Sequence, residues 1–85
     1  MAWYVYILHC GDGTLYTGST NDLDRRLARH QSGRGAKYTR SRRPLRLVYQ
    51  EALPDKSAAL RREAALKRLT RAQKLELIAS AGDPA

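Results

Sequence analysis

WYVYILHC, residues 3–10, is the segment around which the predicted sheet is built. Its β-branched and aromatic residues predict a strand, and because the run is apolar on both faces we expect a central strand that is covered on each side. The turn signal Gly11-Asp12-Gly13 follows, and residues 15–19 (LYTGS) predict a partner strand. The two segments therefore predict a β-hairpin.

A helix is predicted directly after this hairpin. Residues 20–22 (TND) offer several side chains that can cap a helix N-terminus. Leu23, Leu27 and His30 then recur at the spacing of one helix face. The pattern is ended by glycines at positions 33 and 35.

The second half of the chain predicts a basic loop, a third strand and two more helices. Residues 32–44 (SGRGAKYTRSRRP) have no sustained period, which is typical of a mobile loop. Residues 45–51 alternate apolar with polar side chains and predict a half-exposed strand. Good helix formers fill residues 58–69, and the capping box of Thr70 and Gln73 starts a last helix that runs to about residue 80, before a frayed tail with Gly82 and Pro84.

The element order β-β-α-β-α-α predicts an α+β domain, a small three-stranded, mainly antiparallel sheet flanked by helices. The 85 residues suffice for a single domain, 1–85, with its core at about residues 3–80. The single cysteine, Cys10, excludes an internal disulfide and a cysteine cluster for zinc. No apolar run reaches membrane-spanning length and no secretory signal is recognisable, so we expect a soluble, cytoplasmic protein without a membrane partner.

The charge of the chain is strongly positive. Sixteen Lys and Arg side chains oppose eight Asp and Glu side chains, which gives a formal net charge of +8. Arginine-rich surfaces match phosphate and favour a nucleic-acid partner, while a solvated surface or an anionic membrane is the alternative. Residues 25–50 contain no acidic side chain and nine basic ones: Arg25, Arg26, Arg29, Arg34, Lys37, Arg40, Arg42, Arg43 and Arg46.

Sequence motifs of several common enzyme classes are missing. The chain contains no P-loop, GxGxxG, GxSxG, HExxH or CxxC motif. Its two histidines, His9 and His30, do not have the spacing of a metal site. A nucleotide-driven enzyme or a zinc enzyme is therefore disfavoured.

A set of polar side chains is instead predicted to gather near the hairpin and the first helix. If Tyr6 pairs opposite Gly18, then Tyr16 lies diagonal to Tyr6 on the same face of the sheet, about 7–8 Å away. Gly18 would leave room above the sheet at this point. Arg26 and His30 are i, i+4 neighbours on the helix that follows. Two phenols, a guanidinium and an imidazole would then be placed to contact one phosphate.

These segments resemble a known family. Residues 4–6 (YVY) and 16–18 (YTG) are similar to the paired motif of the GIY-YIG nucleases. Residues 19–30 (STNDLDRRLARH) resemble the family's next signature, in which an Arg and a following His lie on the first helix. A later segment, residues 59–67 (ALRREAALK), contains a Glu that matches the family's metal-binding Glu.

The resemblance covers roughly residues 3–69, and the order and spacing of its motifs together are specific. It is closest to the short stand-alone bacterial members, in which residues 35–39 (GAKYT) and 43–44 (RP) also recur. The family's fold, a three-stranded antiparallel sheet flanked by helices, agrees with the fold predicted above. The chain departs from the pattern at Tyr4, where the family name has Gly. The polar residue that follows the metal-binding Glu in many members has no clear counterpart, Gln73 being one candidate.

The resemblance implies cleavage of phosphodiester bonds with one divalent cation, Mg or Mn. It implies that Glu63 binds the metal and that Tyr6 helps to deprotonate the attacking water, although His30 is an alternative base. Tyr16 and His30 would complete a hydrogen-bond relay, and Arg26 would hold the scissile phosphate. One hard carboxylate suits Mg, and a guanidinium offers charge-assisted donors to phosphate. Residues 25–50, with their nine basic and no acidic side chains, are called the basic block. Contacts to nucleic acid are expected from it at Arg29, Arg34, Lys37, Arg40, Arg42 and Arg43.

Each proposed site residue also has a simpler structural interpretation. Tyr6 and Tyr16 would then be ordinary strand aromatics, and His30 a histidine satisfied by the core. Glu63 would be a surface partner of Lys67 at i, i+4.

The sequence therefore predicts a metal-dependent DNA endonuclease-like domain with low sequence specificity. The alternative is a non-catalytic nucleic-acid-binding module of the same fold, while a small protein-interaction domain would leave the arginines unexplained. No residues remain for a separate DNA-targeting domain, so target choice would come from DNA structure, from the loop 34–43 or from a targeting protein partner. We expect a monomer or a weak homodimer that acts in DNA repair. DNA is the expected substrate, and RNA is an alternative that the sequence leaves open.

Overall fold

The sheet has three antiparallel strands, as the sequence predicts. In this computed structural model, which describes residues 2–81, the strand order is β2-β1-β3. The central strand is β1 (Trp3–His9), and β2 (Leu15–Thr20) and β3 (Arg46–Leu53) are the edges. The α+β class and the order of the main elements are confirmed.

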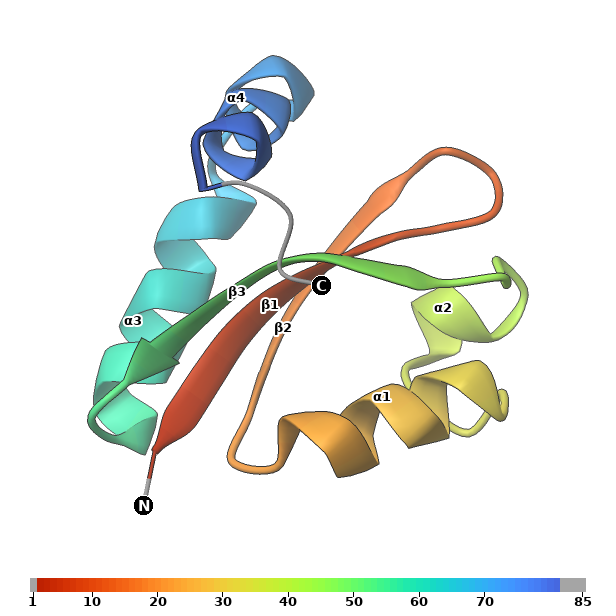
Figure 1. Cartoon of the computed structure of the whole chain (residues 1–85), viewed down its shortest axis with the longest axis horizontal. Helices are drawn as coiled ribbons and strands as arrows, with labels where there is room; N and C mark the ends of the chain where they lie inside the picture. Colours follow the sequence, from red (N-terminus) through yellow and green to blue (C-terminus); the bar gives the residue numbers. More distant parts are fainter. Residues whose placement is uncertain (1, 82–85) are drawn as a thin grey trace.

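Helices cover both faces of this sheet. Figure 1 shows α1 (Leu23–Gln31) and α2 (Lys37–Arg40) on one side, and α3 (Lys56–Lys67) and α4 (Arg71–Ala81) on the other. Side chains of β1 alternate between the two faces and form two cores. Val5 and Ile7 pack with residues of α3 and α4, whereas Tyr6 and Leu8 pack with residues of α1. The expectation of a central strand covered on each side is confirmed.

The register of the hairpin places the candidate tyrosines on one face. Tyr6 pairs with Gly18 and Leu8 pairs with Tyr16, as the sequence predicts. On the other side of β1, the pairing with β3 shifts between Ile7 and Leu8, which marks a bulge.

The predicted helix starts are also present. The Asp22 carboxylate caps α1 by accepting from the Arg25 amide at 3.1 Å. At the start of α4 the Thr70 hydroxyl accepts from the Gln73 amide at 3.2 Å, and the Gln73 side chain accepts from the Thr70 amide at 2.9 Å. This reciprocal pair is the predicted capping box. Helix α1 ends before Gly33, whose φ of +83° suits glycine.

The segment predicted as a mobile loop, residues 32–44, differs from that expectation. It contains the one-turn helix α2, and Thr39 in this helix is completely buried. A helix of four residues has no hydrophobic period to detect, so sequence patterning missed it. The tail signals at Gly82 and Pro84 lie outside the described residues. Within residues 2–81, no helix has the length and apolarity needed to cross a membrane.

Candidate active site

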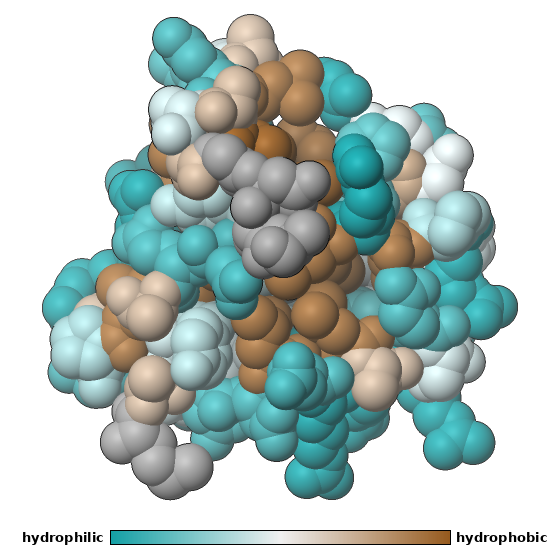
Figure 2. Space-filling view, in the orientation of Figure 1, coloured by the Kyte–Doolittle hydropathy of each residue, from teal (hydrophilic) through white to brown (hydrophobic). Residues whose placement is uncertain are grey.

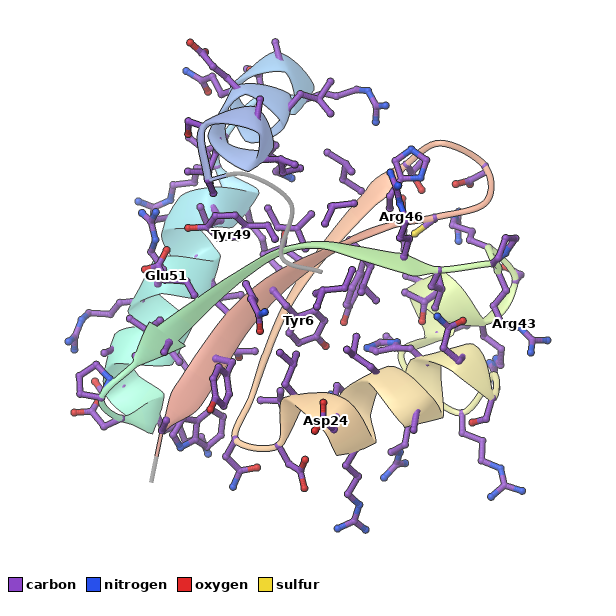
Figure 3. All side chains as sticks on the ribbon, viewed as in Figure 1. Tyr6, Asp24, Arg43, Arg46, Tyr49 and Glu51 are labelled. Carbon is purple, nitrogen blue, oxygen red and sulfur yellow. The ribbon has the colours of Figure 1, made fainter. Side chains whose placement is uncertain are left out.

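Three buried side chains form a hydrogen-bonded chain between β1, α1 and α2. The Tyr6 hydroxyl lies 3.0 Å from Nε2 of His30, and Nδ1 of His30 lies 2.8 Å from Oγ1 of Thr39. None of the three residues has exposed surface. Figure 3 shows Tyr6 extending from the sheet toward α1, whereas Tyr49 and Glu51 lie toward α3. Hydrogen bonds at both ring nitrogens therefore hold the His30 imidazole in place.

Tyr16 adds a second phenol beside this chain. Its ring centroid lies 5.4 Å from that of His30 and 6.4 Å from that of Tyr6. Gly18 makes room at this point, because a Cβ atom there would come within 2.5 Å of the Tyr6 hydroxyl. Gly35 does the same above His30, since its Cβ would overlap the imidazole ring. The predicted gathering of Tyr6, Tyr16 and His30 is present in the structure.

Burial sets the protonation of the Tyr6–His30 pair. Burial raises the pKa of the Tyr6 phenol far above its usual range, Tyr16 adds to that rise, and the Arg26 guanidinium opposes it. Burial also lowers the pKa of His30, and the positive charge of Arg26 lowers it further. At neutral pH the pair is therefore an uncharged phenol and an uncharged imidazole.

Glu63 lies on the other face of the sheet from Tyr6, Tyr16 and His30. It lies on α3, and its Oε1 atom accepts a 2.5 Å hydrogen bond from the Ser19 hydroxyl on the edge strand β2. Lys67, one helical turn away, places its Nζ 2.7 Å from Oε2. Burial acts to raise the pKa of Glu63, but the contacts with Lys67 and Ser19 outweigh it, and the pKa is lowered. The Glu63 carboxylate is therefore ionised, and the positive group that it binds is the Lys67 ammonium.

The electrostatic influence of Glu63 reaches the phenols. Its negative charge contributes to the raised pKa of Tyr6 and of Tyr16, where burial is the largest cause. Arg26 acts in the opposite direction on both phenols and lowers the pKa of Glu63 as well. Tyr6, Tyr16, Arg26 and Glu63 therefore form one electrostatic group at the edge strand.

The donor set available to a metal is a single carboxylate. Among residues 2–81, no group of three or more His, Cys, Asp or Glu side chains is placed to hold a metal ion. Mg binds through one or two carboxylates together with water and substrate phosphates, and carboxylates suit Mn as well. The chemistry of Glu63, one hard carboxylate, is compatible with this mode of binding when Lys67 is displaced from it.

Exposed arginines surround two shallow hollows beside α1. One hollow, of about 330 Å³, is lined by residues 20–22 with Arg25, Arg26 and Arg29. A second, of about 230 Å³, is lined by Arg26, Arg29, Arg34, Gly35 and Ala36. Figure 2 shows hydrophilic side chains along the lower edge of this view, where α1 lies in Figure 1. Arg26 and Arg29 belong to both hollows and join them into one basic surface.

The other arginines of the basic block differ in their surroundings. Arg42 pairs with Asp12 at 3.0 Å, donates to the Tyr38 carbonyl at 2.7 Å and lies 4.0 Å above the Tyr38 ring. Arg43 donates to the Gln31 carbonyl at 3.2 Å. Lys37 and Arg40 are exposed on α2. Arg42 and Arg43 thus also hold the segment between α1 and β3 in place.

Two residues of the site, Thr39 and Ser19, are not indicated by the sequence. Thr39 lies in a segment without periodicity, and Ser19 contacts Glu63 across 44 positions of sequence. The ion pair of Glu63 with Lys67, which the i, i+4 spacing predicts, is present. The recurring GAKYT stretch was the one available signal, because it contains both Gly35 and Thr39.

Comparisons with known proteins agree with this geometry. Residues 2–76 match the model of the GIY-YIG catalytic domain. A UPF0213 protein of Cupriavidus pinatubonensis is 54% identical over 82 residues, which is 96% of this chain and 91% of that protein. A UPF0213 protein of Streptococcus sanguinis is 56% identical over 75 residues, which is 88% of this chain and 86% of that protein.

Two solved structures share the fold. The solution NMR structure of a UPF0213 protein from Bacillus halodurans has a TM-score of 0.64 and 52% identity, and the match covers 99% of this chain and 89% of that one. The solution NMR structure of a protein from E. faecalis has a TM-score of 0.61 and 40% identity, with coverage of 91% and 83%. The family model matches most of the chain, and the matched residues 2–76 include the two strands that carry Tyr6 and Tyr16. The chain therefore belongs to the GIY-YIG nuclease family.

Proposed function

We propose that this protein is a divalent-metal-dependent endonuclease that hydrolyses phosphodiester bonds in DNA with low sequence specificity. The observation that carries the proposal is the group at the edge strand β2. There, a buried Tyr6–His30 pair, the exposed Arg26 and an ionised Glu63 influence one another electrostatically. An ordinary set of core side chains would not combine a buried proton-sharing pair with a cation and an anion.

Arg26 is the residue proposed to hold the scissile phosphate. Phosphodiester hydrolysis places additional negative charge on the non-bridging oxygens, and a preorganised guanidinium stabilises that charge. Arg26 lies between the two basic hollows, so the flanking phosphates of a strand would reach Arg25 and Arg29 on one side and Arg34 on the other. These contacts are to the backbone, which explains the low sequence specificity that we propose.

Tyr6 and His30 are proposed to remove the proton of the attacking water. The raised pKa of Tyr6 keeps the phenol protonated, so it is a poor base alone. An imidazole 3.0 Å from the phenol oxygen offers a place for the proton. Because neither side chain is exposed, a neighbouring side chain has to move before the water can reach them.

Glu63 is proposed to hold the cation, Mg or Mn. When bound, the cation would supply Lewis-acid stabilisation of the phosphate oxygens. Ser19 orients the carboxylate through its 2.5 Å hydrogen bond. Lys67 competes for the same carboxylate and neutralises it in the absence of the cation.

A second candidate function is a non-catalytic nucleic-acid-binding module. The contact of Lys67 with Glu63 favours it, because a carboxylate that is already held in an ion pair is a weaker metal site. Both functions use the same basic surface. Cleavage, rather than binding, therefore separates the two.

The experiment is a cleavage assay with Mg or Mn on labelled duplex, single-stranded and branched DNA, with matched RNA in parallel. The proposal expects metal-dependent cutting of at least one DNA substrate, with products at many sequence positions. Binding of DNA without cutting of any substrate in either metal would support the binding module instead. Cutting that persists in excess chelator would contradict the metal dependence.

A further inference from the structure

The Thr39 hydroxyl makes two hydrogen bonds in the interior of the protein. Its Oγ1 atom lies 2.8 Å from Nδ1 of His30 and 3.0 Å from the carbonyl oxygen of Ala36. Thr39 has no exposed surface, so water does not replace either partner. These two contacts determine which group donates in each hydrogen bond that links Tyr6, His30 and Thr39.

The number of hydrogen atoms on each group fixes the directions of these hydrogen bonds. A threonine hydroxyl has one hydrogen and two lone pairs, and a carbonyl oxygen only accepts. The hydrogen of Thr39 is therefore donated to Ala36, and Oγ1 accepts from His30. The neutral imidazole has a single N–H group, which this acceptor places on Nδ1. Nε2 is then a bare lone pair 3.0 Å from the Tyr6 oxygen, and the phenol is the donor of that hydrogen bond.

We propose that Thr39 is a positioning residue that holds His30 in the tautomer with hydrogen on Nδ1, so that Nε2 is the final proton acceptor of the Tyr6–His30 pair. Its catalytic consequence rests on the proposed nuclease function, whereas the tautomer itself does not. The proposal decides between the two candidate bases, because Tyr6 transmits the proton and His30 keeps it.

The proton transfer leads from the attacking water through Tyr6 to His30. A proton leaves the attacking water for the Tyr6 oxygen while the original phenol hydrogen passes to Nε2 of His30. The hydroxide forms a bond to phosphorus, and the bond from phosphorus to the leaving oxygen breaks with its electron pair on that oxygen. The imidazole then carries hydrogen on both nitrogens, and its Nδ1–H bond to Thr39 is unchanged. Tyr6 ends the step as the neutral phenol it was.

The surroundings of the ring support this assignment. Gly35 lies so close to the imidazole that a Cβ atom there would overlap it, so the backbone packs directly against the ring. With the opposite tautomer, the Thr39 hydrogen would turn toward Nδ1, and the Ala36 carbonyl would keep only its backbone donors, the amides of Thr39 and Arg40. The buried phenol hydrogen of Tyr6 would then face an N–H group on Nε2 and lose this acceptor, which is unfavourable. The observed bonds thus favour one tautomer over the other.

The experiment is ¹⁵N NMR of the His30 ring nitrogens in the wild-type protein, Thr39→Val and Thr39→Ser, at a pH where the imidazole is neutral. The control is Thr17→Val, because the Thr17 hydroxyl is also buried but has no hydrogen-bond partner among residues 2–81. We expect hydrogen on Nδ1 in the wild type, in Thr39→Ser and in Thr17→Val. In Thr39→Val we expect a substantial population with hydrogen on Nε2, and DNA cleavage at least tenfold slower at saturating substrate.

A wild-type signal from hydrogen on Nε2 would overturn the inference, even if Thr39→Val fails to fold. So would an unchanged tautomer and an unchanged cleavage rate in a folded Thr39→Val protein. If the tautomers follow the expectation but the wild-type protein cuts no substrate, the proposed function fails while the tautomer assignment stands.

Discussion

Ser19 and Glu63 join the edge strand β2 to α3 on one face of the sheet. The serine hydroxyl on β2 donates a 2.5 Å hydrogen bond to the carboxylate on α3, across 44 positions of sequence. The neighbour of Ser19 is Gly18, which lies over the Tyr6 hydroxyl on the opposite face. One edge strand therefore carries the contacts of the candidate metal ligand on one face and of the candidate base on the other.

Tyr6→Phe is expected to slow DNA cleavage by about 10²–10⁴-fold, the usual contribution of a positioned proton-transfer group. It also leaves Nε2 of His30 without its donor, so we expect a loss of about 1–3 kcal/mol in the free energy of unfolding. Single-turnover rates and urea denaturation measure the two effects. Tyr49→Phe is the control, because its hydroxyl bonds Glu51 on the face of α3. Equal slowing in both variants would remove Tyr6 from the reaction.

Arg26→Ala is expected to lower the single-turnover rate by about 10²–10³-fold at saturating protein, because the guanidinium acts on the developing charge. The comparison variant is Arg42→Ala, which loses the contacts to Asp12 and Tyr38. We expect Arg42→Ala to weaken binding and to lower thermal stability modestly, with little change in the rate of bound substrate. The same rate loss in both variants would show that Arg26 has no special role.

The stability of the protein is expected to depend on pH through His30. The pKa of His30 is lowered in the folded state, so below the unfolded value of 6.5 the unfolded chain binds more protons. The free energy of unfolding should therefore rise with pH through the range below about 6.5, by at most about 1.4 kcal/mol per pH unit. Urea denaturation between pH 5 and 7.5 measures this slope, above the range in which most carboxyl groups titrate. His30→Gln should flatten it, and an unchanged slope in that variant would contradict the assignment.

DNA binding is expected to depend strongly on salt and weakly on sequence. With roughly 4–6 phosphate contacts, log K should fall against log salt with a slope of about −4 to −5. The double variant Arg29→Ala/Arg34→Ala, in the two hollows beside α1, should flatten the slope by about 2. Arg61→Ala, on α3, is the control that should leave it unchanged. A flat salt response of the wild type would mean that the basic surface serves another partner.

Local signals account for the parts of the fold that could be predicted from the sequence. The hairpin register followed from period-two alternation around a short turn, and the start of α4 from the Thr70–Gln73 capping box. The gathering of Tyr6, Tyr16 and His30 followed from placing two strands and one helix side by side. These features depend on neighbours that are close in sequence or paired by a turn.

Tertiary contacts account for what could not be predicted. Helix α2 is too short to have a period, and the role of Thr39 depends on the burial of its hydroxyl between His30 and Ala36. The hydrogen bond of Ser19 to Glu63 requires α3 to be docked on the far face of the sheet. The internal partners of Arg42 likewise come from a loop and a helix that sequence patterns do not bring together.

The most direct test of the proposed metal-dependent cleavage compares Glu63→Gln with Glu51→Gln. Both are half-buried carboxylates with two side-chain partners each, and Glu51 contacts Tyr49 and Arg62. The measurement is the single-turnover cleavage rate of labelled DNA in Mg or Mn, with DNA binding and unfolding followed in parallel. We expect Glu63→Gln to abolish cutting while it keeps its fold and DNA binding, and Glu51→Gln to cut like the wild type. A Glu63→Gln protein that cuts as fast as the wild type would contradict the metal-binding role of Glu63.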